Sequence, residues 1–159
     1  MTENELREKN QKTIQAFLDG TLAEGCDISE LFCEDGFEEV PFNPSGEPDF
    51  IRGRSALKKL FDENAILFSD YEYYDTTLFP TLDPNIFWVE THGRGTQLFE
   101  GTPKPYENRY FFFFKMKDGL IYEWKEIFDS LKLVRYMGID LPQLPRPHDL
   151  IGTADKAKA

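Results

Sequence analysis

The first third of the chain has apolar residues at helical spacing. Between residues 3 and 19, Leu6, Ile14, Phe17 and Leu18 fall at helical spacing, and Gly20 can end the helix that this pattern predicts. A short second helix is predicted around residues 27–32. A third begins at Ser55, which can serve as its N-cap, and runs to about Phe68. Three helices therefore precede most of the strands.

The pattern changes to strands from Asp70 onward. Runs rich in aromatic and β-branched residues alternate there with turn residues such as Lys117-Asp118-Gly119. Four strands are predicted, at residues 70–79, 86–99, 106–117 and 120–128. A shorter strand at residues 36–42 and a loop rich in proline and glycine come before the third helix. This order predicts an α+β fold, with three N-terminal helices packed on a strongly curved antiparallel sheet.

The length of the chain, 159 residues, is that of one compact domain with its own core. We expect this domain to span residues 1–145. The chain beyond Gly138 is rich in proline and closes with GTADKAKA. Residues 146–159 are therefore predicted to form a flexible C-terminal tail.

The third helix carries one amide in its apolar stripe. The stripe consists of Leu57, Leu60, Phe61, Asn64, Leu67 and Phe68. A buried amide without hydrogen bonds costs about 1–3 kcal/mol. Two interpretations of Asn64 remain open: its side chain ties down backbone, or it lines a cavity.

The last strand carries one carboxylate among aromatic residues. With a period of two, one face holds Tyr122, Trp124, Glu126 and Phe128, and the other holds Ile121, Glu123, Lys125 and Ile127. If the aromatic face is the inner one, burial raises the pKa of Glu126 and suits this group to proton transfer near neutral pH. The alternative is a salt bridge or a surface position near the strand end.

The strand before it is apolar on both faces. Tyr110, Phe112, Phe114 and Met116 alternate with Arg109, Phe111, Phe113 and Lys115. One face must pack on the helices, and the other would leave Phe111 and Phe113 in water. We expect a homodimer through this sheet face. The other interpretation is that the C-terminal tail folds back over the two rings.

Charge and composition exclude several classes of partner. The chain has 29 acidic and 18 basic side chains, a net charge of -11, so nucleic acids and membrane surfaces are not expected partners. The first ten residues lack the apolar stretch of a signal peptide, and no window approaches about 18 apolar residues. We expect a cytoplasmic protein. Fifteen Phe, seven Tyr and two Trp favour large flat surfaces to pack or a flat ligand to hold.

Metal and phosphate sites have little support. Cys26 and Cys33 fit neither a disulfide framework nor a metal spacing, so ordinary thiols are expected. His92 and His148 are far apart in sequence, and HGRG (residues 92–95) lacks the spacing of a phosphate-binding loop.

Two arginines of the predicted strands have alternative roles. Arg94 or Arg109 could bind a substrate carboxylate in a bidentate manner, through two N–H groups of its guanidinium. On an acidic surface an ion pair is the favoured role of each.

Several segments together resemble a known family. They are RGRSAL (52–57), DYEYYDTTLFPTLDPNIFWVE (70–90), PYENRYFFFFKMKDG (105–119), KEIF (125–128) and VRYMGIDLPQ (134–143). They resemble the phenazine biosynthesis A/B proteins, a SnoaL-like group with the cone-shaped α+β fold of ketosteroid isomerase and nuclear transport factor two, a cystatin-like roll. The similarity spans most of residues 5–145. DPNIFWVE, PYEN and the GID-LPQ segment are its most specific pieces.

The resemblance implies a homodimer whose pockets lie between bent sheet and helices. Phenazine A/B proteins assist the condensation of two molecules of an amino-oxo-cyclohexene carboxylic acid by imine formation, without cofactor or metal. By position in KEIF, Glu126 matches the family's acid/base glutamate. Leu60 and Asn64 stand where the family's pocket histidine and serine are expected, so Glu126 alone would carry the acid/base chemistry.

A second carboxylate, Asp129, follows the last strand. The segment IFDSLKLVRYMG (127–138) resembles the strand-to-helix junction of the wider SnoaL-like group, some of whose members use an aspartate to deprotonate a carbon acid. Asp129 can also serve as N-cap of a short helix from Ser130 to Met137. Both roles remain open.

Three functional hypotheses follow from these residues. The first is a cofactor-free acid/base enzyme acting on a small cyclic ligand, with Glu126 as catalytic residue and Asp129 as runner-up. The second is a non-catalytic binding module of the same fold, and the third is a scaffold with a collapsed pocket. The residues expected to contact a ligand are Leu60, Asn64, Phe68, Tyr110, Phe112, Tyr122 and Trp124.

Overall fold

The structure, a computed structural model, describes residues 2–20, 27–68, 70–99 and 101–140. The tail predicted at residues 146–159, together with Cys26 and His148, lies outside the described residues. Within the described part, no helix is long and apolar enough to span a lipid bilayer.

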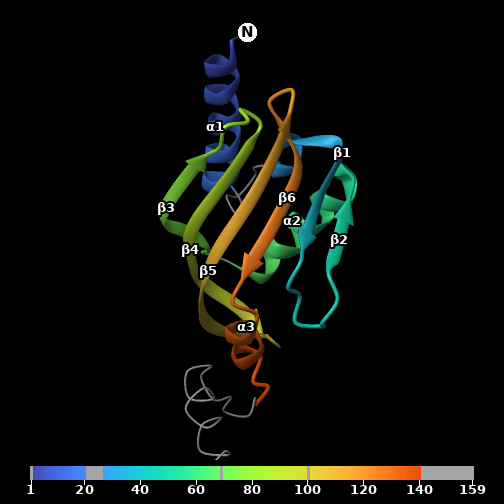
Figure 1. The fold of residues 1–159 in the computed structure, drawn as a ribbon. Helices are drawn as coiled ribbons and strands as arrows, with labels where there is room; N and C mark the ends of the chain where they lie inside the picture. Colours follow the sequence, from blue (N-terminus) through green and yellow to red (C-terminus); the bar gives the residue numbers. More distant parts are fainter. Residues whose placement is uncertain (1, 21–26, 69, 100, 141–159) are drawn as a thin grey trace, which may run out of the picture.

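The chain forms helices and one six-stranded sheet (Figure 1). The elements in order are α1 (Glu3–Gly20), the 3-10 helix η1 (Ile28–Leu31), β1 (Phe32–Val40), β2 (Asp49–Arg52), α2 (Arg54–Leu67), β3 (Glu72–Pro80), β4 (Ile86–Phe99), β5 (Thr102–Lys117), β6 (Leu120–Phe128) and α3 (Ser130–Tyr136). The strand order in the sheet is β2-β1-β6-β5-β4-β3. The predicted α+β class and the four-stranded meander are confirmed.

The sheet is mixed, not wholly antiparallel as predicted. β1 pairs with β6 in parallel, whereas the other neighbouring strands are antiparallel. Parallel neighbours need a long connection, and here β2, α2 and the first three strands of the meander provide it. This pairing brings the first and the last strand of the chain side by side.

Two local predictions are corrected at the start of α2. The loop predicted before this helix contains the short edge strand β2, which pairs with the end of β1. The N-cap of α2 is Gly53, not Ser55, and its φ of 88° lies in the left-handed region that glycine tolerates. The proline and glycine residues nearby concealed a strand of only four residues.

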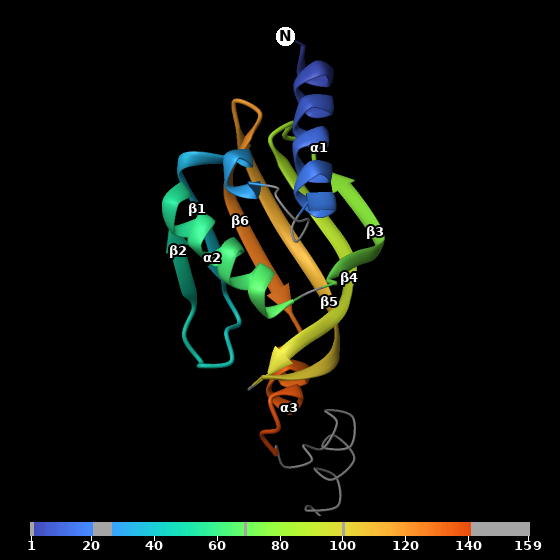
Figure 2. The ribbon, with the colours of Figure 1, turned by 180° about the vertical axis from the view of Figure 1, so that it is seen from behind.

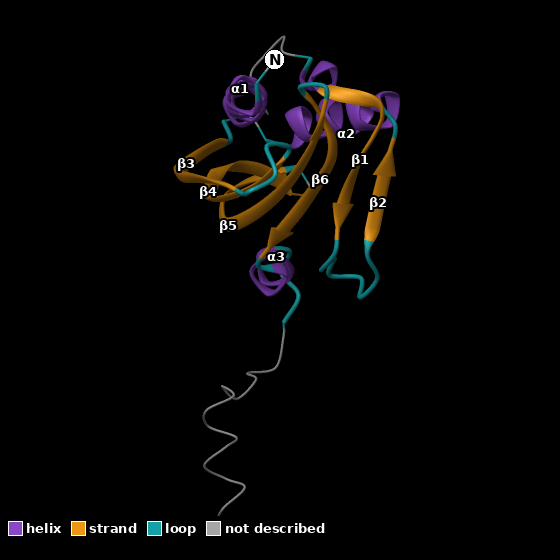
Figure 3. Ribbon diagram, turned by 45° about the horizontal axis from the view of Figure 1, so that its top comes forward, coloured by secondary structure: helices purple, strands orange, loops and turns teal. Residues whose placement is uncertain are grey.

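The helices cover one face of the sheet. Figure 2 shows α1 and α2 lying over this face, and Figure 3 shows α3 at the end of β6. Phe17 of α1 lies at the centre of the core, fully buried, with its ring centroid 4.8 Å from that of Trp124. The other rings around Phe17 are those of Phe32, Phe61, Phe112 and Phe114.

A β-bulge in β6 changes which residues face the helices. The register runs from Met116 opposite Ile121 to Lys115 opposite Glu123, so Tyr122 is an extra residue in β6. Ile121 consequently lies in the core, where the alternation predicted Tyr122. That prediction is wrong for the first residues of β6 and holds for Trp124 and Glu126, which follow the bulge.

The opposite face of the sheet exposes large apolar side chains. Phe79, Trp88 and Phe111 are 47%, 40% and 38% exposed. Trp88 packs edge-on against Phe113 at a centroid distance of 5.2 Å. We call Phe79, Trp88, Phe111 and Phe113 together the outer aromatic face. It lies on the side of the sheet away from α1 and α2.

Candidate active site

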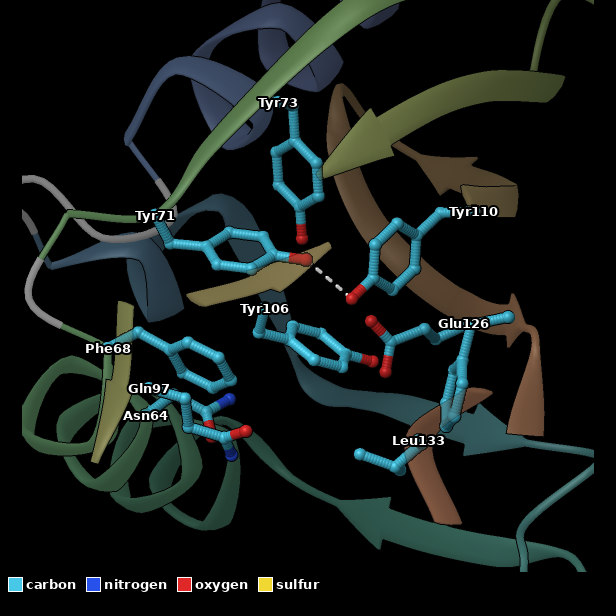
Figure 4. A pocket seen from close by; sticks show the side chains of 10 residues that line it. Asn64, Phe68, Tyr71, Tyr73, Gln97, Tyr106, Tyr110, Glu126 and Leu133 are labelled. Carbon is cyan, nitrogen blue, oxygen red and sulfur yellow. Dashed lines mark hydrogen bonds between the residues drawn. The ribbon is translucent and has the colours of Figure 1, made fainter. Parts of the chain in front are cut away.

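A cavity of about 190 Å³ lies beside the C-terminal end of α2, with Asn64 and Phe68 on one side and Glu126 of β6 on the other (Figure 4). We call it the aromatic chamber. Its walls are Asn64, Phe68, Tyr71, Tyr73, Gln97, Tyr106, Tyr110, Glu126, Phe128 and Leu133. Six of these ten side chains are aromatic, and they converge from β3, β5, β6 and the segment between α2 and β3. Such walls suit a flat ligand.

A second hollow of about 390 Å³ adjoins the first and is here called the acidic chamber. The two share Asn64, Glu126, Phe128 and Leu133. The acidic chamber adds Glu38, Val40, Asn43, Pro44, Asp49, Ile51, Leu60 and Met137. Glu126 therefore stands at the junction between an aromatic space and one that contains two further carboxyl groups.

Glu126 is placed by the pairing of β5 with β6. It lies opposite Phe112, which is fully buried, so its side chain must point to the helix-covered face. Figure 4 shows its carboxyl group directed toward the space between the tyrosine hydroxyls. Glu126 is half-buried by surface area, because it faces the cavity, while protein atoms surround the carboxyl group.

The surroundings of Glu126 suit it to proton transfer. Burial raises the pKa of Glu126 from its ordinary value of 4.5 to about 7, since a charged carboxylate loses hydration there. Such a group can both take and return a proton near neutral pH.

Glu38 is a second carboxyl group in the same region. It lies on β1 opposite Trp124 of β6, and only 3% of its surface is exposed. Burial raises the pKa of Glu38 well above the ordinary range, and the negative charges of Glu126 and Asp49 raise it further. Because two neighbouring carboxylates repel, the pair holds at least one proton over a wide range of pH.

Tyrosine hydroxyl groups form the other side of the aromatic chamber. The hydroxyl groups of Tyr71 and Tyr110 are hydrogen-bonded at 2.5 Å, and the Asn108 amide donates to the hydroxyl oxygen of Tyr106 at 2.7 Å. Burial raises the pKa of Tyr71, Tyr106 and Tyr110. These hydroxyl groups stay protonated. Tyr106, together with whichever of Tyr71 and Tyr110 accepts their shared hydrogen bond, can therefore donate a hydrogen bond to a ligand oxygen.

Two glycines of β4 make room for Tyr71. A Cβ atom at Gly93 would overlap the Tyr71 hydroxyl oxygen, and one at Gly95 would lie 2.8 Å from the Tyr71 Cα. The HGRG segment therefore has a packing role, in which absent side chains let a tyrosine ring lie flat on the strand.

We predict that Gly93→Ala destabilises the protein by roughly 1–3 kcal/mol, because the new methyl group overlaps the Tyr71 ring. Urea unfolding measures the effect. In a Tyr71→Ala background the same Gly93→Ala change is expected to cost almost nothing, since its clash partner is gone. Equal costs in both backgrounds would contradict the proposed packing.

The sequence predicted seven ligand-contacting residues and one catalytic residue, Glu126. The structure places five of these eight at the cavity. Asn64, Phe68, Tyr110 and Glu126 line the aromatic chamber, and Leu60 lines the acidic chamber. The three others lie elsewhere: Phe112 and Trp124 in the core and Tyr122 against Phe37 and Lys117. The bulge in β6 turns Tyr122 away from the inner face, and Phe112 and Trp124 pack against Phe17 in the core instead of lining the cavity.

Asp129, the second candidate for the catalytic carboxylate, is the N-cap of α3. Its carboxylate accepts a hydrogen bond from the backbone N–H of Lys132 at 3.0 Å and caps α3, and its side chain is exposed. Arg94 and Arg109 form ion pairs with Glu72 and Glu90. None of these three candidates lines either chamber.

Sequence reasoning missed several cavity residues. They include Glu38, Asp49, Tyr71, Tyr73, Gln97, Tyr106 and Leu133. Alternation along residues 70–79 could have found Tyr71 and Tyr73, which share one face. No sequence signal pointed to Glu38, because its neighbour in the cavity, Glu126, is far away along the chain on the parallel strand.

Metal coordination has no support in the part of the chain that the structure describes. No group of three or more His, Cys, Asp or Glu side chains there could hold a metal ion.

Comparisons with known proteins agree on one family. A family model described as phenazine biosynthesis protein A/B matches residues 1–151. The phenazine biosynthesis protein PhzA2 of Pseudomonas aeruginosa is 37% identical over 143 residues, 89% of this chain and 88% of that protein. The crystal structure of PhzB2 from the same organism has a TM-score of 0.81 at 34% identity and covers 91% of this chain and 95% of that one.

A more distant structure extends the likeness in fold. A protein named as a putative polyketide cyclase from Xanthomonas campestris has a TM-score of 0.69 at 16% identity, over 83% of this chain and 98% of that one. The architecture is thus the cone-shaped α+β fold of SnoaL-like and ketosteroid isomerase-like proteins, as predicted. By sequence and by structure, the chain belongs to the phenazine biosynthesis protein A/B family.

Proposed function

We propose that the protein is a cofactor-free acid/base catalyst of condensation or isomerisation. Its substrate is a small cyclic ketone, amino-ketone or carboxylic acid held in the two chambers. Glu126 moves the proton, and the site of action is the cytoplasm. The observation that carries this proposal is the position of Glu126 at the junction of the two chambers, with its pKa raised to about 7.

Each wall of the cavity has a role in this proposal. The Glu126 carboxylate removes a proton from the carbon next to a ligand carbonyl, and the carboxylic acid so formed returns it to the product. Protonated tyrosine hydroxyls donate hydrogen bonds to the carbonyl oxygen, where negative charge develops. Leu60 and Asn64 cannot titrate, so they contribute shape and hydrogen bonding.

Solvent deuterium exchange tests this function without knowledge of the natural substrate. The protein is incubated in D2O with cyclohexanone, 4-aminocyclohexanone or the amino-oxo-cyclohexene carboxylic acid implied by the family, and NMR follows loss of the protons next to the carbonyl. Exchange above the buffer rate with at least one of these compounds is expected. The condensation itself would appear as absorbance of a conjugated tricyclic product.

The alternative function is a non-catalytic binding homodimer of the same fold. Leu60 and Asn64 favour it, because neither replaces the titratable histidine that the family resemblance implies at position 60. Saturable binding of these compounds without deuterium exchange on long incubation would support the binding protein and contradict the enzyme.

We further propose that two chains associate through the outer aromatic face. Its exposed rings are better covered by a second copy than by water, and Phe111 lies near its centre, on β5. Analytical ultracentrifugation at micromolar concentration is expected to give twice the mass of one chain. Phe111→Glu should give a monomer, whereas Leu82→Glu, at a fully exposed loop position, should not. A monomeric wild type would favour cover by residues 146–159 instead.

A further inference from the structure

Three carboxyl groups line the acidic chamber from three neighbouring strands, β2, β1 and β6. Glu38 of β1 lies opposite Trp124 of β6, and Glu126 follows two residues later on the same face. Asp49 of β2 lies opposite Val40, two residues after Glu38 on β1. Long side chains at such diagonal positions of adjacent strands are within reach of each other. We call Asp49, Glu38 and Glu126, in this order across the sheet, the carboxyl row.

The carboxyl row leads from solvent to the junction of the two chambers. Asp49 is exposed, Glu38 is 3% exposed, and Glu126 stands where the chambers meet. A ring held in the aromatic chamber covers Glu126 from that side, so the acidic chamber is then the route by which its proton can leave. With about 390 Å³, this chamber can also hold water molecules that bridge gaps between the carboxyl groups.

Glu38, in the middle of the row, has no partner that would give it a purely structural role. No hydrogen bond or ion pair joins its carboxyl group to a residue that the structure describes, although buried polar groups are normally paired. None of the described residues that line either chamber is Lys, Arg or His, so no cation there holds a carboxylate in the ionised state. A proton on Glu38 can therefore move along the row.

We propose that the carboxyl row is a proton relay, in which Glu38 carries protons between Glu126 and Asp49 at the solvent. This inference rests on the proposed function, since it names the route by which Glu126 regains its ionised form during a reaction. Glu38 acts through Glu126 and not on the reacting atoms of the ligand. Leu60 and Asn64, on the walls of the same chamber, have no carboxyl group and cannot replace it.

The charge of Glu126 controls whether Glu38 keeps its proton. Burial raises the pKa of Glu38, and the negative charges of Glu126 and Asp49 raise it further. When Glu126 takes a proton from the ligand, its negative charge disappears and Glu38 becomes a stronger acid. Glu38 then passes its own proton by way of Asp49 to water, and the proton of Glu126 moves to Glu38. Glu126 is a carboxylate again, Glu38 is protonated as before, and one proton has reached the solvent.

Isomerisation of cyclohex-3-enone in D2O tests the relay, because the product records where each proton came from. Glu126 removes a proton from the carbon between the carbonyl group and the double bond, and a proton is then added at the far end of the double bond to give cyclohex-2-enone. If Glu126 keeps the proton, the same proton is returned there. If the relay has exchanged it, NMR finds deuterium at that carbon. We expect most of the wild-type product to carry this deuterium.

The wild-type result needs no variant to fold and separates the relay from the proposed function. Conversion of the ketone with little deuterium in the product would overturn the relay and leave the catalysis standing. If the wild type neither converts the ketone nor exchanges its protons with D2O, the proposed catalysis fails, and the relay fails with it.

Glu38→Gln removes the middle of the row and preserves the shape of the side chain. The deuterium content per molecule of product is expected to fall by ~3-fold or more, because Glu126 then returns the proton that it took. A slower chemical step alone does not lower this content. Asp49→Asn should lower it in the same direction, since it removes the end of the row at the solvent.

The matched control is Glu39→Gln, one residue along the same strand but on the outer face, beside Lys125. Its product should contain as much deuterium as that of the wild type. An unchanged deuterium content in both Glu38→Gln and Asp49→Asn, or an equal fall in Glu39→Gln, would contradict the relay.

Discussion

Glu126→Gln is expected to slow deuterium exchange into a cyclic ketone by about 10²–10⁴-fold. Glutamine preserves the volume of the side chain but can neither remove nor return the proton. Because the ring still fits among the chamber tyrosines, the affinity for neutral cyclohexanone should change less than tenfold. A large fall in rate with little change in affinity identifies the group that transfers the proton.

The control for this variant is Glu123→Gln, on the same strand. Glu123 faces the outer side of the sheet, where it pairs with Lys125. Its replacement should leave the exchange rate unchanged. If Glu126→Gln retains the wild-type rate, another group carries the proton, and the proposed mechanism is wrong.

Stability should fall as the pH rises from about 4.5 to neutrality, by an amount on the order of a few kcal/mol. The folded pKa of Glu126 is about 7 and that of Glu38 is also raised, whereas both groups ionise near 4.5 in the unfolded chain. Between these values the folded state holds more protons than the unfolded state. The free energy of unfolding therefore decreases from about pH 4.5 to pH 7, and further as Glu38 ionises.

Urea unfolding at several pH values between 5 and 8.5 measures this dependence. The double variant Glu38→Gln/Glu126→Gln cannot ionise at these positions, so its stability should be nearly constant over the range and exceed that of the wild type at pH 8. The double variant Glu39→Gln/Glu123→Gln, which alters carboxyl groups on the other face, should keep the wild-type slope. If the stability of the wild type rose with pH, the pKa values of Glu38 and Glu126 could not be raised by burial in the folded protein.

Elements with strong local periodicity were predictable from the sequence. The predicted α1, the meander strands and the short helix after Asp129 all occur close to their expected bounds. Alternation after the bulge also put Glu126 on the same face as Trp124, and the structure shows that this face is the inner one. These features depend on residues two to four positions apart, so the local sequence pattern is enough to predict them.

The family was likewise accessible from the sequence, because its motifs are contiguous. PYEN and KEIF, for example, are runs of consecutive residues, so they can be recognised without knowledge of the fold. The resemblance singled out Glu126 by its position in KEIF, and it marked Leu60 and Asn64 as departures from the family. Both of these departures lie on the wall of the cavity.

Only the tertiary structure decided the composition of the cavity. One extra residue in β6 moved Tyr122 out of the inner face, and alternation cannot reveal a bulge. The parallel pairing of β1 with β6 brought Glu38 close to Glu126. The sequence by itself determined α1, the strands of the meander and the acid/base candidate. Long-range pairing decided that this carboxyl group has an acidic neighbour, because register between distant strands depends on packing rather than on local pattern.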